Sequence, residues 1–512
     1  MVSALLLLIG FFVQEPQVPV FRSTTRLVQV NVVVHGRDGK PVTGLKKEDF
    51  RIFEKGKPQT ISVFNEASLD KLPASPVTLP PHVYSNQLAQ RNGAPGSITA
   101  ILLDSVNTTF PDQIYGRRAV IDFLLQVNPS DHIAIYELMG SRFRILHDYT
   151  TDASELIRIL KASRSLAIPD LESVGGRGAE MSLHRQTRIL RTLQALEMIA
   201  NHLASVPGRK NLVWVSDGFP LVTEFRGFPT FYTPEMDHAV RALNDAAVAV
   251  YPVDAGGLRT DPRLSFTENP SGSLEPLPPR LPSNRDTMLK LADRTGGRAY
   301  YDTNNLKKAI REAIADSDVT YTLGYHPEDG DMDGKFREIK VTVNRPGVKV
   351  RNRRGYFAMK PADASEKVRK AEMDSAVWSP LDATALPMNA RVDFVEKPDP
   401  RSVHVLVQLD PSNLSLERKD DRYSGELDII MVQKDERGTV RADGIHDTLD
   451  LNMKQESYNK IMKEGLIYEK TFPRIPGATN IRLVVRDVGT GAVGSITVPY
   501  KEVEVPVPPK GN

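Results

Sequence analysis

The chain has 512 residues, of which 40% are hydrophobic and 25% charged, enough apolar content for several packed cores. Its formal net charge is +2, so composition does not favour a general nucleic-acid or membrane-surface binder. Cysteine is absent, which excludes disulfides, thiolate metal sites and cysteine nucleophiles.

The chain starts with an apolar run. Residues 4–13 are apolar almost throughout, and polar residues follow around Pro16. The run is shorter than the ~20 residues that cross a bilayer, and it is typical of the core of a secretory signal peptide. We therefore expect residues 1–20 to be a signal segment. The mature chain is then exported to the periplasm, cell surface or medium, without an integral membrane segment. The alternative is a mis-assigned start or a short buried segment.

A small β unit is expected over residues 25–66. Valines alternate along residues 28–34, which is the period of a strand, and Asp38-Gly39 is a turn signal. Such a unit is too small to bury a core alone, so we expect it to pack on a neighbour. Residues 67–96 are interrupted by prolines and are expected to be a linker.

Strands and helices alternate from residue 97 to 318. The runs "SITAILLD" and "KNLVWVS" are continuously apolar, as in a sheet covered on both faces. Between them, residues 112–127 and 183–204 carry apolar side chains at helical spacing. The pattern predicts an α/β domain with a doubly wound, mostly parallel, Rossmann-like sheet.

The remainder of the chain returns to β structure. Residues 319–360 are expected to be a β extension that packs on the preceding domains, and residues 361–387 a charged linker. Residues 388–505 contain several short alternating strands, which is typical of an antiparallel β-sandwich.

Two aspartates follow buried strands. Asp104 ends the first strand of the α/β segment, and Asp217 ends the strand "LVWVS". Ligands of doubly wound sheets bind beyond the carboxyl ends of the strands. Carboxylates and hydroxyls are the oxygen ligands that a hard divalent cation prefers, so Asp104, Thr108 and Asp217 are candidate ligands of Mg²⁺ or Mn²⁺. The alternative is structural, because strand-end aspartates also cap helices and close turns.

The segments "DSVNT" and "SDG" resemble the metal-ion-dependent adhesion site of von Willebrand factor type A domains. Asp104 matches the first aspartate of the Asp-x-Ser-x-Ser pattern and Thr108 its last hydroxyl. Asp217 matches the aspartate of the later loop. Val106 stands where the pattern has a serine, so the site is expected to be partly degenerate.

The resemblance implies further oxygen ligands. Ser105 and Ser216 are additional candidates beside the matched positions. The threonine that the family supplies from a second loop has no match, and Ser173 or Ser182 are alternatives for it.

A longer resemblance covers residues 25–360. The segments "VTGLKKEDFRIFEKGKPQTISVF", "GRKNLVWVSDGFP" and "LADRTGGRAYYDTNNLKKAI" resemble the exported proteins with a von Willebrand A-related domain found in Acidobacteria. The family has no established activity to carry over, and our leading hypothesis is a non-enzymatic, exported binding or adhesion-type protein whose carboxyl-end rim binds a protein or a surface polymer. The alternatives are a structural assembly scaffold with an inert metal site and an unrecognised hydrolase. The metalloprotease, serine-hydrolase and nucleotide-binding motifs are absent from the sequence.

The acidic stretch "DGDMDG" resembles the start of a calcium-binding loop. Asp329, Asp331 and Asp333 match the opening of such a loop, but Lys340 occupies the position of its bidentate glutamate. A solvated hairpin turn is therefore the favoured interpretation.

Overall fold

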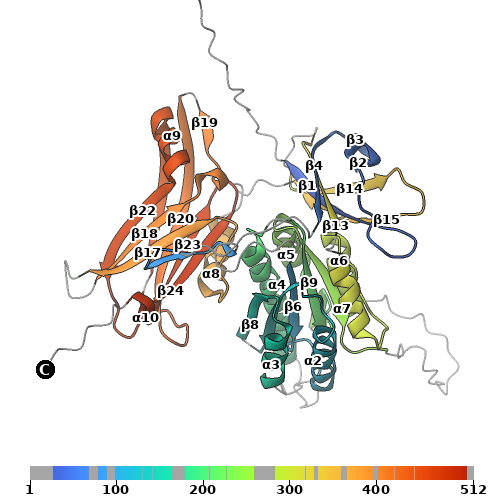
Figure 1. Cartoon of the computed structure of the whole chain (residues 1–512). Helices are drawn as coiled ribbons and strands as arrows, with labels where there is room; N and C mark the ends of the chain where they lie inside the picture. Colours follow the sequence, from blue (N-terminus) through green and yellow to red (C-terminus); the bar gives the residue numbers. More distant parts are fainter. Residues whose placement is uncertain are drawn as a thin grey trace, which may run out of the picture.

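The computed structural model places most of the chain in three domains (Figure 1). It describes residues 27–68, 79–88, 98–129, 131–140, 142–163, 179–206, 208–225, 228–258, 283–316, 319–327, 333–358, 366–395, 402–419, 421–442 and 444–503. The expected signal segment lies outside the described residues. In the described part, no helix is long and apolar enough to cross a membrane.

The central domain is built on a five-stranded sheet. Its strands lie in the order β12, β9, β6, β7 and β8, with bounds Val248–Asp254, Lys210–Ser216, Ile98–Asp104, His132–Met139 and Arg142–Thr150. The first four run parallel, and β8 adds to the edge antiparallel. The expected mostly parallel sheet is thereby confirmed.

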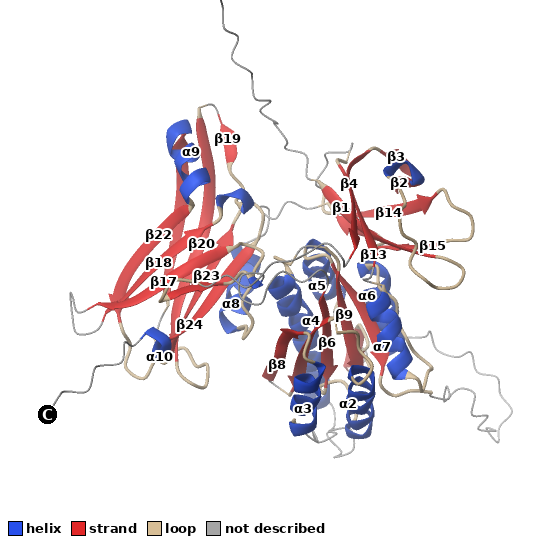
Figure 2. Cartoon of the chain, in the orientation of Figure 1, coloured by secondary structure: helices blue, strands red, loops and turns tan. Residues whose placement is uncertain are grey.

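Helices cover both faces of this sheet (Figure 2). One face packs against α2, α3 and α7, with bounds Phe110–Leu124, Ala153–Ala162 and Leu306–Ala315. The other packs against α4, α5 and α6, with bounds Ala179–Leu203, Thr233–Asp245 and Asn284–Thr295. Along β6, Ile101 and Leu103 join the first cluster, while Ala100 and Leu102 join the second. The strand is apolar throughout because both of its faces are buried. A hairpin of β10 (Val222–Phe225) and β11 (Phe228–Phe231) precedes α5.

The N-terminal β domain combines two distant parts of the chain. One sheet has the order β15, β1, β13 and β4, with bounds Lys349–Asn352, Val28–His35, Val319–Tyr325 and Ile61–Ser68. The other has the order β16, β14, β2 and β3, with bounds Gly355–Phe357, Phe336–Val343, Phe50–Glu54 and Lys57–Gln59. Strands from both sheets contribute to one apolar cluster. The segments expected as a separate unit (25–66) and an extension (319–360) therefore interleave, because neither supplies enough apolar surface for a core.

The C-terminal domain also has two sheets around one apolar cluster. The first has the order β22, β18, β17 and β5, with bounds Leu466–Pro473, Ser402–Leu409, Met388–Val395 and Val83–Ser85. The second has the order β19, β20, β23 and β24, with bounds Glu417–Lys419, Arg422–Lys434, Asn480–Asp487 and Val493–Pro499, and β21 (Ile445–Lys454) pairs with β20. Helices α9 (Gln455–Glu464) and α10 (Tyr500–Val503) complete it.

Both expected linkers contain regular structure. Within residues 67–96, strand β5 pairs with β17, and the buried Asn86 amide donates to the Ala383 and Leu386 carbonyls at 2.7 and 3.0 Å. Within residues 361–387, helix α8 (Glu366–Trp378) packs on β20 and β23. The described parts of both segments therefore contact distant parts of the chain, which local sequence did not indicate.

Contacts between domains lie toward the amino ends of the central strands. Asp316, just after α7, accepts from Arg351 of β15 at 2.5 Å and from Tyr251 at 2.8 Å. At the end of α4, the Thr384 hydroxyl donates to the His202 carbonyl at 2.8 Å and accepts from the Ser205 N–H at 2.9 Å. The β domains are thus attached around the amino-end side of the central domain, opposite the edge that carries Asp104.

Candidate functional site at the carboxyl ends of the strands

The parallel pairing of β6 and β9 brings the two predicted loops to one edge. Leu103 lies opposite Val215, so Asp104 and Ser216 follow side by side. The Ser216 hydroxyl donates to Asp104 Oδ2 at 2.9 Å, and the Thr108 hydroxyl accepts from the Asp217 N–H at 3.3 Å. The predicted residues from the two loops therefore lie close together.

The Asp104 carboxylate is buried and accepts hydrogen bonds on both oxygens. Only 2% of the residue is exposed. Oδ1 accepts from the backbone N–H groups of Val106 and Asn107, both at 3.1 Å. Oδ2 accepts from the Asn107 amide at 2.8 Å, the Trp214 indole N–H at 3.1 Å and the Ser216 hydroxyl. Asp104 thus ties its own loop to the end of the neighbouring strand.

The burial of Val106 accounts for a valine at the position where the adhesion-site pattern has a serine. Its side chain is 7% exposed and belongs to the apolar cluster beneath α4 and α5. The Val106 side chain therefore packs into the core, whereas the serine of the pattern would place a hydroxyl at the rim.

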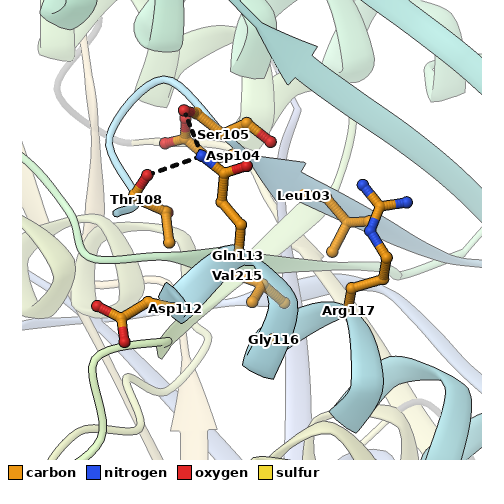
Figure 3. A pocket seen from close by; sticks show the side chains of 9 residues that line it. All are labelled: Leu103, Asp104, Ser105, Thr108, Asp112, Gln113, Gly116, Arg117 and Val215. Carbon is orange, nitrogen blue, oxygen red and sulfur yellow. Dashed lines mark hydrogen bonds between the residues drawn. The ribbon is translucent and has the colours of Figure 1, made fainter. Parts of the chain in front are cut away.

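The Gln113 side chain bridges two backbone carbonyls of the Asp104 loop (Figure 3). Its amide donates to the Ser105 and Thr108 carbonyls at 3.2 and 2.9 Å. A cavity of about 10 Å³ beside it is lined by these residues, by Gly116 and by Val215. That volume suits about one water molecule, so this cavity is too small for an organic ligand.

The hydrogen bonds around Asp104 do not fit a directly bound cation. A divalent cation needs carboxylate lone pairs that face it, and here N–H and O–H donors use them. The Trp214 indole and the two backbone N–H groups cannot turn into acceptors. Asp104 therefore does not fit as a direct ligand. Without Asp104, the Mg²⁺ or Mn²⁺ site expected from the sequence is reduced to Thr108 and Asp217.

The additional candidates Ser105 and Ser216 lie in this arrangement but make hydrogen bonds within the protein. Ser105 contributes its backbone carbonyl to Gln113, and Ser216 spends its hydroxyl on Asp104. Ser173 and the side chain of Ser182 lie outside the described residues. In the part of the chain that the structure describes, no group of three or more histidine, aspartate or glutamate side chains is arranged to hold a metal.

The expected hairpin across the acidic stretch is not formed, because the flanking strands β13 and β14 lie in different sheets. Asp333 accepts from the Arg337 guanidinium at 2.7 Å and from the Lys335 N–H at 3.1 Å. Asp329 and Asp331 lie outside the described residues.

Sequence reasoning missed a polar chain that leads from Asp104 to α4. The Asn107 amide donates to the Thr192 hydroxyl at 2.6 Å, and the Arg188 guanidinium donates to Asn107 Oδ1 at 3.4 Å. Arg188 is half-buried and places a positive charge at the rim. Helical spacing puts Arg188 and Thr192 on one face of α4, but nothing local pairs that face with Asn107.

Large apolar side chains are exposed on the other side of the same loop. Phe110 and Ile114 in the first turns of α2 are 42% and 50% exposed, and Leu258 beyond β12 is 65% exposed. Asn304 brings these segments together, because it accepts from the Leu258 N–H at 3.1 Å and its carbonyl accepts from the Tyr115 hydroxyl. The rim therefore combines a rigid polar loop with an apolar surface.

No family model and no curated protein matches the chain. Two solved structures resemble it over part of its length. One is an aerotolerance-related membrane protein from Bacteroides fragilis, at 13% identity and a TM-score of 0.26, covering 43% of this chain and 98% of that one. The other is the SpRpn10 VWA domain, at 8% identity and a TM-score of 0.25, covering 43% of this chain and 96% of that one.

Proposed function

We propose that this chain is a non-enzymatic binding protein whose central domain, of the von Willebrand factor type A kind, holds a protein ligand at the carboxyl-end rim. The observation that carries the proposal is the exposure of Phe110, Ile114 and Leu258 around the Asp104 loop. Grouped exposed apolar side chains beside polar residues are typical of protein-interaction surfaces.

The rigidity of the loop supports a binding role. Asp104 and Gln113 hold the loop backbone through side-chain hydrogen bonds, so the rim is organised before a ligand arrives. A preorganised surface loses less conformational entropy on binding. Arg188 adds a guanidinium that suits a carboxylate on the ligand.

The proposed recognition needs no bound cation. Asp104 is occupied by its own hydrogen bonds, and the ligand contacts assigned here come from apolar side chains and Arg188. The two β domains, which we propose to be sandwiches, contact the central domain on the side of the strands' amino ends, away from the rim. We also propose export, on the apolar start of the sequence alone.

A phage-displayed random peptide library selected against the full chain tests the proposal. We expect the enriched peptides to lose binding to a Phe110→Ser/Leu258→Ser double variant. Leu125→Ser is the matched control, because Leu125 is 66% exposed at the other end of α2. We expect this variant to keep binding.

Two outcomes would overturn the proposal. Peptides that bind the double variant as well as the parent chain place the binding surface elsewhere and favour the structural scaffold. Failure to enrich any peptide that the parent chain binds would remove the rim as a peptide-binding surface.

A further inference from the structure

A second polar cavity lies at one end of the N-terminal β domain. In the sheet register His35 at the end of β1 lies opposite Lys349 at the start of β15. The turn after β1 and the turn before β15 therefore leave the sheet at the same end. Residues 36–38, 40–43 and 345–348 of these turns line an open cavity of about 460 Å³. This volume lies within the ~300–1,000 Å³ typical of small-ligand sites.

The lining of this cavity is positively charged. Arg37, Lys40 and Arg345 supply three positive charges and Asp38 one negative charge, a net of +2. Asp38 Oδ1 accepts from the Lys40 backbone N–H at 3.1 Å, so this carboxylate serves its own turn. Among the described residues, no ion pair joins any of the three cations to a carboxylate.

The Arg37 guanidinium is positioned by the opposite turn. A Cβ added to Gly347 would lie 2.7 Å from Arg37 Nε, so the guanidinium rests directly on the Gly347 backbone. Gly347 has a φ of 75°, a left-handed conformation that glycine adopts without strain. Arg37 is exposed, and this contact holds its charge against the opposite turn.

We propose that this cavity binds a phosphate group, carried as a phosphomonoester or as free phosphate. A phosphomonoester carries about −1.5 to −2 charges at neutral pH, which complements the net charge of the lining. Planar guanidinium groups donate two parallel hydrogen bonds to phosphate oxygens, and two of the three cations are arginines. The site is separate from the carboxyl-end rim and does not depend on the role proposed there.

Isothermal titration calorimetry of the full chain tests the proposal with glucose 6-phosphate, inorganic phosphate, inorganic sulfate and glucose as probes. We expect binding of a phosphate probe and none of glucose. Arg37→Gln and Arg345→Gln should each weaken that binding at least about tenfold, because each removes charge-assisted hydrogen bonds. Gly347→Ala should also weaken it, because it displaces Arg37.

Lys349→Gln is the matched control, since Lys349 is an exposed cation next to the turn but outside the cavity lining. It should bind as the parent chain does, and thermal melting will establish that each variant is folded. Tighter binding of glucose 6-phosphate than of phosphate supports a phosphorylated carbohydrate, and equal binding supports free phosphate. No binding of either probe at millimolar concentration, equal binding of sulfate, or equal weakening by Lys349→Gln would overturn the assignment.

Discussion

The Trp214 indole N–H donates to Asp104 Oδ2 across 3.1 Å, so a core residue of β9 holds the carboxylate at the end of β6. Both residues are buried, with 0% and 2% exposed. This hydrogen bond attaches the Asp104 loop to a side chain of the hydrophobic core. Substitution of Trp214 should therefore change the stability of the chain.

We expect Trp214→Phe to lower the free energy of unfolding. The phenyl ring retains most of the packing, but a buried carboxylate loses a donor, which costs roughly 1–3 kcal/mol. Urea unfolding measures the change. Trp378→Phe is the control, because Trp378 is 56% exposed, and its effect should stay within about 0.5 kcal/mol. Equal losses for the two variants would contradict the structural role of the indole.

Addition of Mg²⁺ or Mn²⁺ should leave the melting temperature unchanged. A cation present at a hundred times its Kd would stabilise the native chain by about 2.7 kcal/mol, which a thermal melt detects readily. The measurement compares the parent chain in EDTA and in millimolar cation. A stabilisation that Asp217→Ala abolishes would instead establish the predicted metal site at Thr108 and Asp217.

The ion pair between Arg351 and Asp316 should contribute strongly to the attachment of the N-terminal β domain. Asp316 is 4% exposed in its side chain, and its Oδ1 lies 2.5 Å from the guanidinium. Arg351→Met removes the arginine from this buried carboxylate and leaves it the His35 ring at 3.4 Å and the Tyr251 hydroxyl at 2.8 Å. We expect a loss of about 3 kcal/mol in urea unfolding.

Arg354→Met is the matched control for that variant. Arg354 pairs with Asp293 of α6 at 2.8 Å across the same two domains, but the two side chains are 58% and 51% exposed. Its loss should be about 0–1 kcal/mol. A similar cost for both arginines would show that burial does not distinguish the two pairs.

His238 should make stability depend on pH. Its ring lies 3.3 Å from Glu197 of α4 and 3.1 Å from Glu372 of α8. The hydrogen bonds to Glu197 and Glu372 outweigh burial and raise the pKa of His238 from 6.5 to about 10. Because the folded pKa is raised, this stabilisation is complete below pH 6.5 and is lost as the pH rises toward 10.

We therefore expect His238→Gln to lose about 1.5–3 kcal/mol at acidic pH. The difference from the parent chain should shrink steadily up to about pH 10. Chemical unfolding across this range measures it. His404→Gln, which removes an exposed pair with Glu469, should cost at most about 1 kcal/mol. A difference for His238→Gln that stays constant with pH would count against the assignment.

Lys210 should have the opposite dependence. Burial lowers the pKa of Lys210 from 10.5 to about 7, while Nζ donates to the Val206 carbonyl at 2.6 Å. Between these two values the unfolded chain binds more protons than the native chain, so the free energy of unfolding rises with pH.

Lys210→Met should remove this rise and stabilise the chain at neutral pH by about 1–4 kcal/mol. Lys308→Met, at a side chain 71% exposed, should leave the rise intact. If the free energy of unfolding still rises with pH in Lys210→Met, another titratable group causes the rise.

Local sequence patterns determined the central domain and the place of its rim. The uninterrupted apolar run of β6 requires cover on both faces, and strand–helix alternation requires parallel neighbours. Because parallel strands end at one edge, Asp104 and Asp217 had to approach each other. These inferences need only periodicity and chain direction, which are present in any short window of the sequence.

Only the tertiary structure decided how the residues of the rim are used. Strand β5 is three residues long, and its partner β17 lies some three hundred residues later, so no local pattern marks it. Likewise, the indole of Trp214 and the amide of Asn107 reach Asp104 through strand register and loop geometry. The motif therefore placed Asp104 at the rim, but it does not tell whether the carboxylate faces a cation or protein donors. That choice depends on side chains brought together from separate strands and helices, which a local motif does not encode.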